Sequence, residues 1–539
     1  MMKTIFPLTL IILVLFSFSP ADRGVEIKVD ASRTVGELQP FWASQIIHPT
    51  EFLRSEWGRE FAQLLAETGA ARQFIRIYNQ PEYAVRIDSG GNVSFDWSHF
   101  DEMAEIIIST GNKLQVVFFA MVPEWAKYPD SKRERPYGAI VHTSPPRDYQ
   151  LWEELVSDFM RHVLQKYGLE EIKQWLFRCW NEPDLGGFWH QADLNEYLKL
   201  YDHFAKAAKA VHEEIRIGGP ALSSTRTWNN PENFTFFLDH IVNGKNHATG
   251  ETGSPIDFLD IHTYGGTRSR GGPGRDFPDI DYMLEQQMRY ADMRDQYPAL
   301  RHVPIHVFEW GVAASGARGV DIEPMADFRN SQYGAAFLAT LVDRHIRIQT
   351  ENDRHIKSFT FCASGYERLR ERNFMGFRTL HTKDGFHKPI LNAYKLLDKL
   401  SDELVAVTIE RPHEHVSSYA TRDADRISIV AVNFQHDKIF HTGPTYSVTL
   451  QLESDWSPDT NVSVRHWRID ETHSNAYTTY RRIGSPLILN PLEIDAVKNR
   501  MHLEQLETPV EMPWEEAQNL QFELPCNAVS LIEIIRNSR

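Results

Sequence analysis

The sequence has few cysteines, with three in 539 residues, and this limits how the fold can be cross-linked. Cys179, Cys362 and Cys526 lie far apart in apolar surroundings, and their odd number rules out full pairing. We therefore expect three free, buried thiols. The sequence also has no zinc-ribbon spacing, no glycine-rich phosphate loop and no heptad repeat. We therefore expect no zinc ribbon, no phosphate-binding loop of this kind and no coiled coil.

Positive charge is scarce as well. Asp and Glu number 73 against 57 Lys and Arg, which gives a formal net charge of −16. A nucleic-acid or anionic-membrane partner would require a basic face, so we expect neither. With 42% hydrophobic and 24% charged residues and no low-complexity run, the chain is predicted to be globular and long enough for two domains.

One long apolar run stands at the N-terminus. It extends from Ile5 to Phe18, follows Lys3 and ends at Ser19-Pro20-Ala21-Asp22. This order of a positive residue, an apolar centre and small residues predicts a signal peptide over residues 1–22, and hence a secreted or periplasmic protein. A membrane anchor is the alternative, but the run is shorter than the ~20 residues that a spanning helix needs.

Between residues 37 and 400, short apolar runs alternate with longer amphipathic stretches. The predicted strands are 41–47, 73–79, 114–120, 174–180, 215–220, 258–264, 303–309 and 358–364. The predicted helices lie near 55–68, 98–110, 149–167, 194–214, 232–243, 279–296, 328–348 and 388–400. The strands are almost continuously apolar, as expected for a parallel sheet buried on both faces. Eight such units predict an α/β fold, the (β/α)8 TIM barrel.

After residue 400 the helical periodicity fades. Short strand candidates with turn residues between them lie at 405–409, 427–434, 447–452, 462–469 and 529–535. This pattern predicts a β-sandwich accessory domain over residues 401–539. The segment Val25–Val29, which precedes the barrel, is a candidate additional strand of that domain.

Two glutamates stand at the ends of predicted barrel strands. Glu182 follows the fourth strand in Trp180-Asn181-Glu182-Pro183, and Glu309 ends the seventh in Val307-Phe308-Glu309-Trp310-Gly311. Active sites of such barrels lie at the C-terminal ends of the strands, and an ionisable residue there is costly unless it lines a cavity. Glycosidic bond cleavage needs two carboxyl groups, one to protonate the leaving oxygen and one to attack or to activate water. The alternative is a helix cap or a partner for an arginine.

Residues 40–400, with these two motifs, resemble glycoside hydrolase family 39, which contains β-xylosidases and α-L-iduronidases. The most specific stretch is Trp180–Trp189, and Gly218-Gly219-Pro220-Ala221 and His262-Thr263-Tyr264 also fit the family pattern. The resemblance implies a retaining mechanism with Glu182 as acid/base and Glu309 as nucleophile.

The same resemblance implies roles for the residues around the two glutamates. Asn181 would bond the 2-hydroxyl beside the reacting carbon. His262 and Tyr264 would line the pocket for the terminal sugar, with Tyr264 close enough to touch the nucleophile.

The sequence departs from the family at two places. Arg76-Ile77-Tyr78-Asn79 stands where members commonly carry Arg-x-His-Gly, so Tyr78 replaces a sugar-contacting histidine beside Arg76. After the eighth strand, residues 362–367 replace an aromatic-rich segment, and Glu367 is a candidate for binding sugar hydroxyls. Exo-acting release of a xylose-like sugar is the leading hypothesis. A uronic acid, galactose or arabinose is the alternative, and a non-catalytic carbohydrate-binding barrel is a hypothesis from another class.

Aromatic residues at strand ends are candidates for stacking on the apolar faces of sugars. Trp310, next to Glu309, is the first choice, and Trp189 is a second. Phe118 is either a wall of the sugar site or part of the filling of the barrel. For Trp125, a sugar contact and core packing are equally favoured.

Two further patterns are weaker indications of function. His302 and His306 have the spacing of a helical metal pair, but Pro304 and the β-branched neighbours predict a strand, so neither a metal nor another cofactor is expected. The basic residues Arg268, Arg270 and Arg275 lie in a glycine-rich loop after the sixth strand. This loop is either simply solvated or a contact for an acidic sugar.

Overall fold

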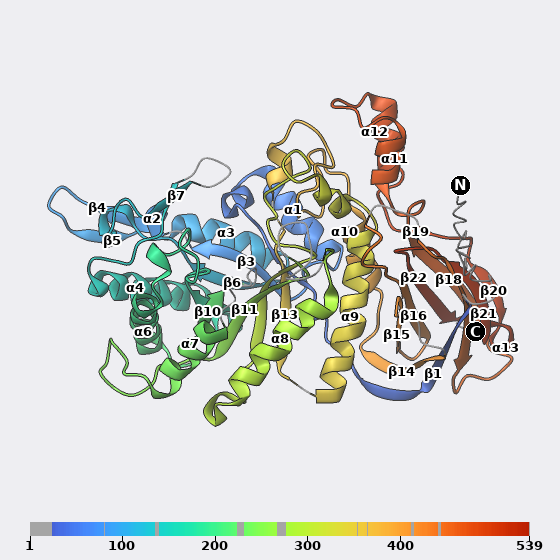
Figure 1. The fold of residues 1–539 in the computed structure, drawn as a ribbon, viewed down its shortest axis with the longest axis horizontal. Helices are drawn as coiled ribbons and strands as arrows, with labels where there is room; N and C mark the ends of the chain where they lie inside the picture. Colours follow the sequence, from blue (N-terminus) through green and yellow to red (C-terminus); the bar gives the residue numbers. More distant parts are fainter. Residues whose placement is uncertain are drawn as a thin grey trace, which may run out of the picture.

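The computed structural model describes residues 24–79, 81–134, 140–223, 231–266, 276–352, 354–363, 365–410, 414–439 and 443–537. It consists of a barrel with a sheet-rich unit packed at its side (Figure 1). The predicted signal peptide lies outside the described residues, as do Arg268, Arg270 and Arg275.

Eight parallel strands close into the predicted barrel. They are β2 (Ser44–Ile46), β3 (Phe74–Asn79), β6 (Lys113–Phe118), β9 (Leu176–Cys179), β10 (Ile217–Leu222), β11 (Phe258–Tyr264), β12 (Ile305–Gly311) and β13 (Ile356–Phe361). Around them lie α1 (Glu56–Glu67), α3 (Ser98–Ser109), α4 (Tyr149–Tyr167), α6 (Leu194–Val211), α7 (Pro231–Asn243), α8 (Ile280–Asp295), α9 (Tyr333–Asn352) and α10 (Pro389–Leu397). The (β/α)8 prediction is confirmed.

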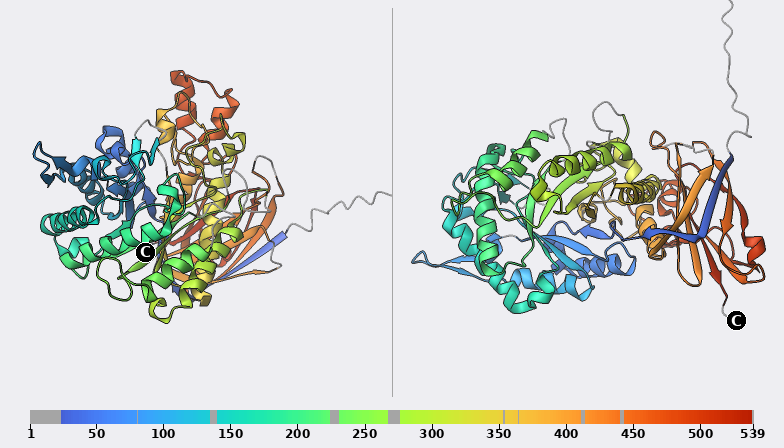
Figure 2. Two further views of the ribbon diagram at one scale, coloured as in Figure 1. Left: turned by 60° about the vertical axis from the view of Figure 1, so that its left-hand side comes forward. Right: turned by 90° about the horizontal axis from the view of Figure 1, so that it is seen from below.

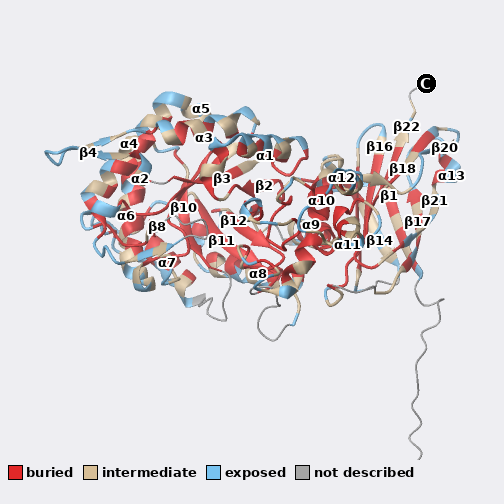
Figure 3. Cartoon of the chain, turned by 90° about the horizontal axis from the view of Figure 1, so that it is seen from above, coloured by how far each residue is buried: buried red, intermediate tan, exposed pale blue. Residues whose placement is uncertain are grey.

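The barrel strands are buried on both faces because helices cover the outside and side chains fill the inside (Figure 3). On β3, Ile75 and Ile77 pack in the layer under the helices. Arg76 between them crosses the interior and donates to the carbonyl of Phe308 on β12. Alternation along each strand thus separates an apolar outer layer from an interior that holds charged residues.

Short elements extend the loops above the barrel. The hairpin β4 (Val85–Ile87) and β5 (Val93–Phe95) follows β3, and the hairpin β7 (Lys132–Glu134) and β8 (Ile140–His142) follows β6. Both hairpins follow the C-terminal ends of their strands and therefore lie on the face where the site was predicted.

The second unit is a ten-stranded mixed sheet. Its strands are β1 (Gly24–Glu37), β14 (Glu403–Glu410), β15 (Val416–Arg422), β16 (Arg426–Asn433), β17 (Tyr446–Glu453), β18 (Asn461–Ile469), β19 (Glu504–Gln505), β20 (Val510–Pro513), β21 (Asn519–Leu524) and β22 (Val529–Arg536). One hydrophobic core joins β1 and β17 to β16 and β22, which lie apart in the sheet order, so the sheet folds into two layers. The helices α11 (Ala476–Arg482), α12 (Pro491–Lys498) and α13 (Trp514–Ala517) were not predicted, and α11 and α12 project from this unit (Figure 1).

The two units share a packed boundary. Ile427 and Ile429 of β16 lie in the core of the folded sheet, whereas Val430 and Val432 belong to the same cluster as the barrel. Helix α9 contacts β15, β16 and β22 on that second face. The alternating pattern of β16 therefore serves two cores, one on each face.

The first described strand is central to the second unit. β1 pairs with β14 antiparallel and with β17 parallel, and Figure 2 shows it crossing from the barrel side into the sheet. The strand expected at Val25–Val29 therefore belongs to the sheet, although it precedes the barrel in sequence.

Two further features of the fold concern the cysteines and the length of the helices. All three cysteines are free; Cys179 and Cys526 are buried and Cys362 is partly exposed, so full burial holds for two of them. In the described part of the chain, no helix combines the length and apolar character needed to cross a membrane.

We predict that Ile27→Ala lowers the free energy of unfolding by about 2–4 kcal/mol, because Ile27 is fully buried in the folded sheet and its truncation leaves a cavity. Val35→Ala on the same strand is the control; Val35 is 44% exposed and should cost roughly 0.5 kcal/mol or less. Denaturant unfolding of the full chain measures both. Equal losses for the two variants would contradict a central role for β1.

Candidate active site

The side chains of Glu182 and Glu309 meet above the barrel interior, at the C-terminal ends of β9 and β12. A carboxyl oxygen of each and a ring nitrogen of His262 all lie within 4.8 Å of one another. Both glutamates are more than nine-tenths buried. The prediction that these two residues come together is therefore confirmed.

Glu309 is held by two donors. Arg76 Nη2 donates to its Oε1 over 2.6 Å, and the hydroxyl of Tyr264 donates to its Oε2 over 2.7 Å. The contact expected between Tyr264 and Glu309 is thus present. Burial alone would raise the pKa of Glu309, but the electrostatic influence of the adjacent His262 and of the Arg76 guanidinium, together with the Tyr264 bond, holds its pKa well below the usual range. Glu309 is therefore a carboxylate.

A register shift in β12 turns Glu309 into the barrel. Ile261 of β11 pairs with Val307, but the next residue, His262, pairs with Glu309, so Phe308 is an extra residue between the two pairs. Phe308 packs inside the barrel against Leu176 and Phe258. Strict alternation would have placed Glu309 on the outer side with Val307, and the extra residue reverses this.

Glu182 lies on a strained turn directly after β9. Its φ is 47°, in the left-handed region that non-glycine residues rarely adopt. Two backbone bonds hold this turn: the Glu182 N–H donates to the Ala221 carbonyl over 2.9 Å, and the Leu185 N–H donates to the Glu182 carbonyl over 3.0 Å. The turn points the carboxyl group toward His262 and Glu309.

The pKa of Glu182 is shifted in the opposite direction from that of Glu309. Burial, and then the negative charge of Glu309, raise it to about 8. Within the described residues Glu182 forms no ion pair with a lysine or arginine, and its close partner is the imidazole of His262, with Nδ1 at 2.9 Å from Oε1. Glu182 therefore carries a proton at neutral pH.

The tautomer of His262 follows from the residues beneath it. Arg178 Nη1 lies 3.1 Å from His262 Nε2, and because an arginine can only donate, Nε2 must accept. Burial lowers the pKa of His262 to about 4, so the ring is neutral and its one proton is on Nδ1. His262 therefore donates to Oε1 of Glu182, which leaves Oε2 as the oxygen that carries the carboxyl proton.

Arg178 and Asp260 were missed in the sequence analysis. Arg178 Nη1 also donates to Asp260 Oδ2 over 3.0 Å, and both residues are fully buried inside the barrel. Each interrupts an apolar strand run, in Leu176-Phe177-Arg178-Cys179 and Phe258-Leu259-Asp260-Ile261. A charge inside a buried strand was therefore the signal that could have identified them.

Asn181 and Tyr78 link Arg178 to Arg76. Oδ1 of Asn181 accepts from Arg178 Nη2 and, over 3.5 Å, from the hydroxyl of Tyr78, which itself accepts from Arg76 Nη2 over 2.8 Å. Both bonds go to Oδ1, so the amide is oriented with Nδ2 as its remaining donor. In the described part of the chain we find no protein acceptor for Nδ2.

Charge balance explains why the two glutamates differ. Arg76 pairs with Glu309 and Arg178 pairs with Asp260, so each permanent positive charge in the barrel floor has its own carboxylate. Within the part of the chain that the structure describes, Glu182 has no such partner, and it stays protonated. With a protonated carboxyl group and a proton on His262 Nδ1, this trio is poorly suited to hold a metal, although its atoms are close enough.

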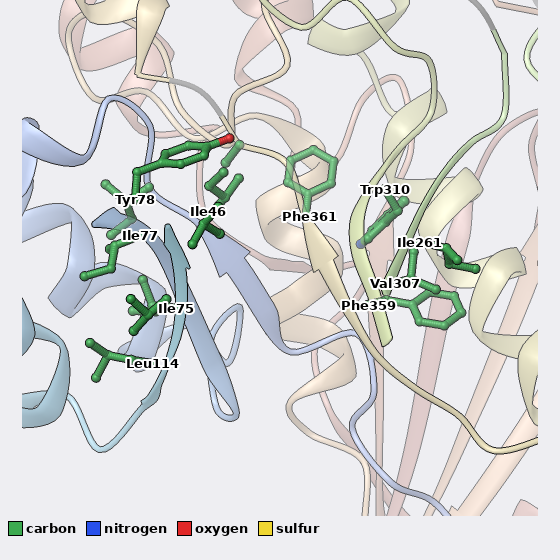
Figure 4. Close-up of a cluster of buried hydrophobic side chains, with 14 of the residues drawn as sticks. Ile46, Ile75, Ile77, Tyr78, Leu114, Ile261, Val307, Trp310, Phe359 and Phe361 are labelled. Atoms are coloured by element: carbon green, nitrogen blue, oxygen red, sulfur yellow. The ribbon is translucent and has the colours of Figure 1, made fainter. Parts of the chain in front are cut away.

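Trp310 and Trp189, which were predicted to stack on sugar, are part of the core, so these two predictions are wrong. Of the two roles left open for Phe118, a wall of the sugar site or filling of the core, the structure shows the second. Trp310 is fully buried in the outer layer beside Phe361, because the extra residue in β12 turns it away from the interior (Figure 4). Phe118 packs against Trp152 and Phe204 under the helices. Trp189 packs on Trp180, and its indole N–H donates to the Asp193 carbonyl. Trp125 is likewise buried.

Glu367 is also not a sugar ligand. It is fully buried and forms a 2.7 Å ion pair with Lys388, which is buried too. Its carboxylate also accepts from the Met375 N–H and the Thr379 hydroxyl. These bonds use the acceptor positions of Glu367 to hold the segment after β13, so the predicted sugar contact is wrong.

Two further arginines stand near the pair. Arg378 places its guanidinium 4.7 Å from the centre of the Tyr264 ring, and its Nε donates to the Cys362 carbonyl. Arg133 of β7 stacks on Phe188 at 4.0 Å, and its charge acts on Glu182. Neither was predicted, because Arg133 of β7 and Arg378 lie far in sequence from the barrel strands that end at Glu182 and Glu309.

Comparison with known proteins identifies the family of the chain. A family model for glycosyl hydrolases family 39 matches residues 25–517. A β-xylosidase of Caldicellulosiruptor saccharolyticus is 25% identical over 489 residues, or 87% of this chain and 90% of that protein. An α-L-iduronidase of Homo sapiens is 23% identical over 505 residues, or 87% of this chain and 72% of that protein. The crystal structure of a monomeric β-xylosidase from Caulobacter crescentus CB15 has a similar fold, with a TM-score of 0.79, 22% identity and coverage of 95% and 100% of the two chains.

The raised pKa of Glu182 predicts a pH-dependent stability. Its folded-state pKa of about 8 lies above the usual 4.5. Below pH 4.5 Glu182 is protonated in both states and does not change the free energy of unfolding. Between pH 4.5 and about 8 only the unfolded state loses the proton, so the free energy of unfolding falls progressively. Relative to the wild type, the free energy of unfolding of Glu182→Gln should therefore gain on the order of 5 kcal/mol between these limits. Melting temperatures of both proteins at about pH 5 and about pH 9 test this. A difference that is the same at both pH values would contradict the assignment of Glu182 as the protonated group.

Proposed function

Because the chain belongs to glycosyl hydrolases family 39 and is therefore a retaining glycoside hydrolase, we propose that it releases a terminal sugar as a β-xylosidase does. In this proposal Glu182 is the acid/base and Glu309 the nucleophile. The observation that supports this proposal is that two carboxyl groups, with an oxygen of each within 4.8 Å of the other, have pKa values displaced in opposite directions. Retaining enzymes keep their pair about 5–5.5 Å apart, whereas inverting enzymes need roughly 6.5–9.5 Å to admit a water.

The first step uses both protonation states. Oε2 of Glu182 donates its proton to the glycosidic oxygen, while a carboxylate oxygen of Glu309 attacks the anomeric carbon and the bond to the leaving group breaks. The product is a glycosyl ester on Glu309 and a free leaving group. Arg76 and Tyr264 stabilise the carboxylate that departs in the second step.

The second step reverses the roles. Once Glu309 is esterified, its negative charge is lost, and so is the second cause of the raised pKa of Glu182. Glu182 is then a carboxylate that takes a proton from water as the water attacks the anomeric carbon. This restores a protonated Glu182 and an ionised Glu309. The His262 Nδ1–H bond to Oε1 keeps Glu182 aimed in both steps.

The neighbouring groups supply contacts for the sugar. Nδ2 of Asn181 is oriented to donate to the 2-hydroxyl, and Tyr78, which is 6% exposed, lies beside it with its hydroxyl bonded to both Asn181 and Arg76. Trp310, Trp189 and Phe118 are excluded as stacking surfaces, so apolar contact with the sugar falls to other residues. Export is a further part of the proposal, and the apolar run of residues 5–18 supports it.

One observation favours a second candidate substrate. Arg378 is a positive group beside Tyr264, which touches the nucleophile, and Arg133 adds another near Glu182. A positive rim suits a sugar that carries a carboxylate, as uronic acids do. A uronosidase with the same mechanism is therefore the alternative to a β-xylosidase.

We predict that Glu309→Ala abolishes hydrolysis of aryl glycosides that the wild type cleaves, and that azide restores turnover with an α-configured product on a β-glycoside. Glu182→Ala should lose roughly 10²–10⁴-fold on poor leaving groups, and azide should yield a β-configured product. Glu124→Ala is the control, because Glu124 is an exposed glutamate just beyond β6. Rates and product NMR measure the outcome, and unchanged activity in Glu309→Ala would disprove its role.

The sugar itself is tested by a substrate panel. We expect the aryl β-xyloside to give the highest kcat/KM among β-xyloside, α-L-iduronide, β-glucuronide, β-galactoside and α-L-arabinoside. A single misplaced hydroxyl costs little in an apolar pocket and much where a buried donor loses its partner, so the ranking reports on the polar contacts. A uronide at the top of the ranking would replace the β-xylosidase proposal with the alternative.

A further inference from the structure

A second cluster of ionisable residues lies on the opposite face of the barrel from Glu182 and Glu309. Asp202 comes from α6, His240 from the end of α7, and His247 from the loop that leads to β11. Because this loop enters the amino-terminal end of β11, the cluster is on the face that supports stability in such barrels. Helices α6 and α7 lie next to each other in Figure 1.

The three side chains converge on one point. His240 Nε2 lies 3.0 Å from both carboxylate oxygens of Asp202, and His247 Nδ1 lies 2.8 Å from Oδ2. One ligand atom of each residue lies within 4.8 Å of the others, and the two imidazoles stack with centres 5.4 Å apart. Donor atoms around a tetrahedral zinc ion are about 3.3 Å apart, so small side-chain rotations suffice to bring all three onto one ion.

Asp202 lacks a permanent counter-charge. Its side chain is fully buried, and its ion-pair partners in the described part of the chain are the two histidines alone. Burial by itself would raise its pKa, but bonds from His240, the His247 N–H and Ser254 hold that pKa below the usual value. A buried carboxylate in native proteins is paired or binds a metal. Among the described residues, Asp202 receives hydrogen bonds, but no lysine or arginine supplies a cation.

We propose that Asp202, His240 and His247 bind one divalent transition-metal ion of the zinc class. Two imidazole nitrogens and one carboxylate oxygen are a donor set that zinc accepts, and a solvent molecule completes four-fold coordination. The side chain of His247 is 42% exposed, so an ion can reach the cluster from solvent. The ion neutralises Asp202 and ties α6, α7 and the loop before β11 together. Its role is structural, since the active site is at the other end of the barrel.

The full-length protein, freed of metal with a chelator, is titrated with Zn²⁺ by calorimetry and with Co²⁺ by visible absorption. We expect one Zn²⁺ per chain, a rise of a few degrees in Tm on binding, and ligand-field bands of tetrahedral Co²⁺. His247→Ala should fold, because His247 is partly exposed, and should weaken Zn²⁺ binding by at least about 100-fold. Loss of an outer-shell partner alone costs 10–100-fold, and loss of a ligand costs more.

Three comparisons decide the outcome. His436→Ala, at an exposed histidine of the sheet unit, should bind Zn²⁺ as the wild type does, and His247→Ala should keep its glycosidase activity. Absence of stoichiometric binding in the wild type at micromolar Zn²⁺ would overturn the proposal and leave a hydrogen-bonded cluster. Binding that persists in His247→Ala but is lost in Glu309→Gln would also overturn it, because the ion would then be at Glu182, His262 and Glu309.

Discussion

The ion pair between Arg76 and Glu309 determines the rest of the site. Arg76 is fully buried, and its 2.6 Å bond keeps Glu309 ionised in surroundings where a lone carboxylate would be protonated. The negative charge that this bond preserves is one cause of the raised pKa of Glu182. One arginine on β3 thus helps to give the glutamate after β9 and the glutamate on β12 different protonation states. Two chemically identical side chains differ in pKa because their electrostatic surroundings differ.

A second buried ion pair plays a positioning part. Arg178 and Asp260 neutralise each other beneath the site, so Arg178 can direct its donors to His262 and Asn181 without leaving an excess charge. The bond to Nε2 selects the tautomer in which His262 donates to Glu182. All of these side chains extend from barrel strands or from the turn after β9, and such elements hold a reacting geometry more rigidly than long loops do.

The two ends of the barrel differ in what their charged residues do. At the C-terminal end, charges are placed for chemistry, and a strained turn at Glu182 is tolerated because it aims a carboxyl group. At the amino-terminal end, the proposed metal would compensate a buried charge and hold helices together. The folded sheet adds a further constraint: β16 packs on the barrel with one face and in its own core with the other, so the two units are joined by a continuous apolar layer.

Much of this was accessible from the sequence, since the signals were local. The alternation of apolar runs with amphipathic stretches is a property of neighbouring residues, and it was enough to predict the eight strands, the eight helices and the positions of Glu182 and Glu309. The replacement of the family's histidine by Tyr78 was also visible in the sequence. Arg178 and Asp260 could have been found by the rule that identified the glutamates, because each places a charge inside an apolar strand.

Other features depended on contacts between distant segments. One extra residue in β12, visible only in its pairing with β11, turns Glu309 inward and Trp310 outward, so a correct strand assignment still gave a wrong stacking residue. Glu367 meets Lys388, and Arg378 meets Tyr264, through loops whose path the sequence does not encode in any short pattern. The sequence by itself determined the barrel and the places of Glu182 and Glu309 at the ends of two strands, because strand ends are defined locally. Only the tertiary structure decided which glutamate keeps its proton and which aromatic rings are buried, because pKa and burial depend on every neighbour in space.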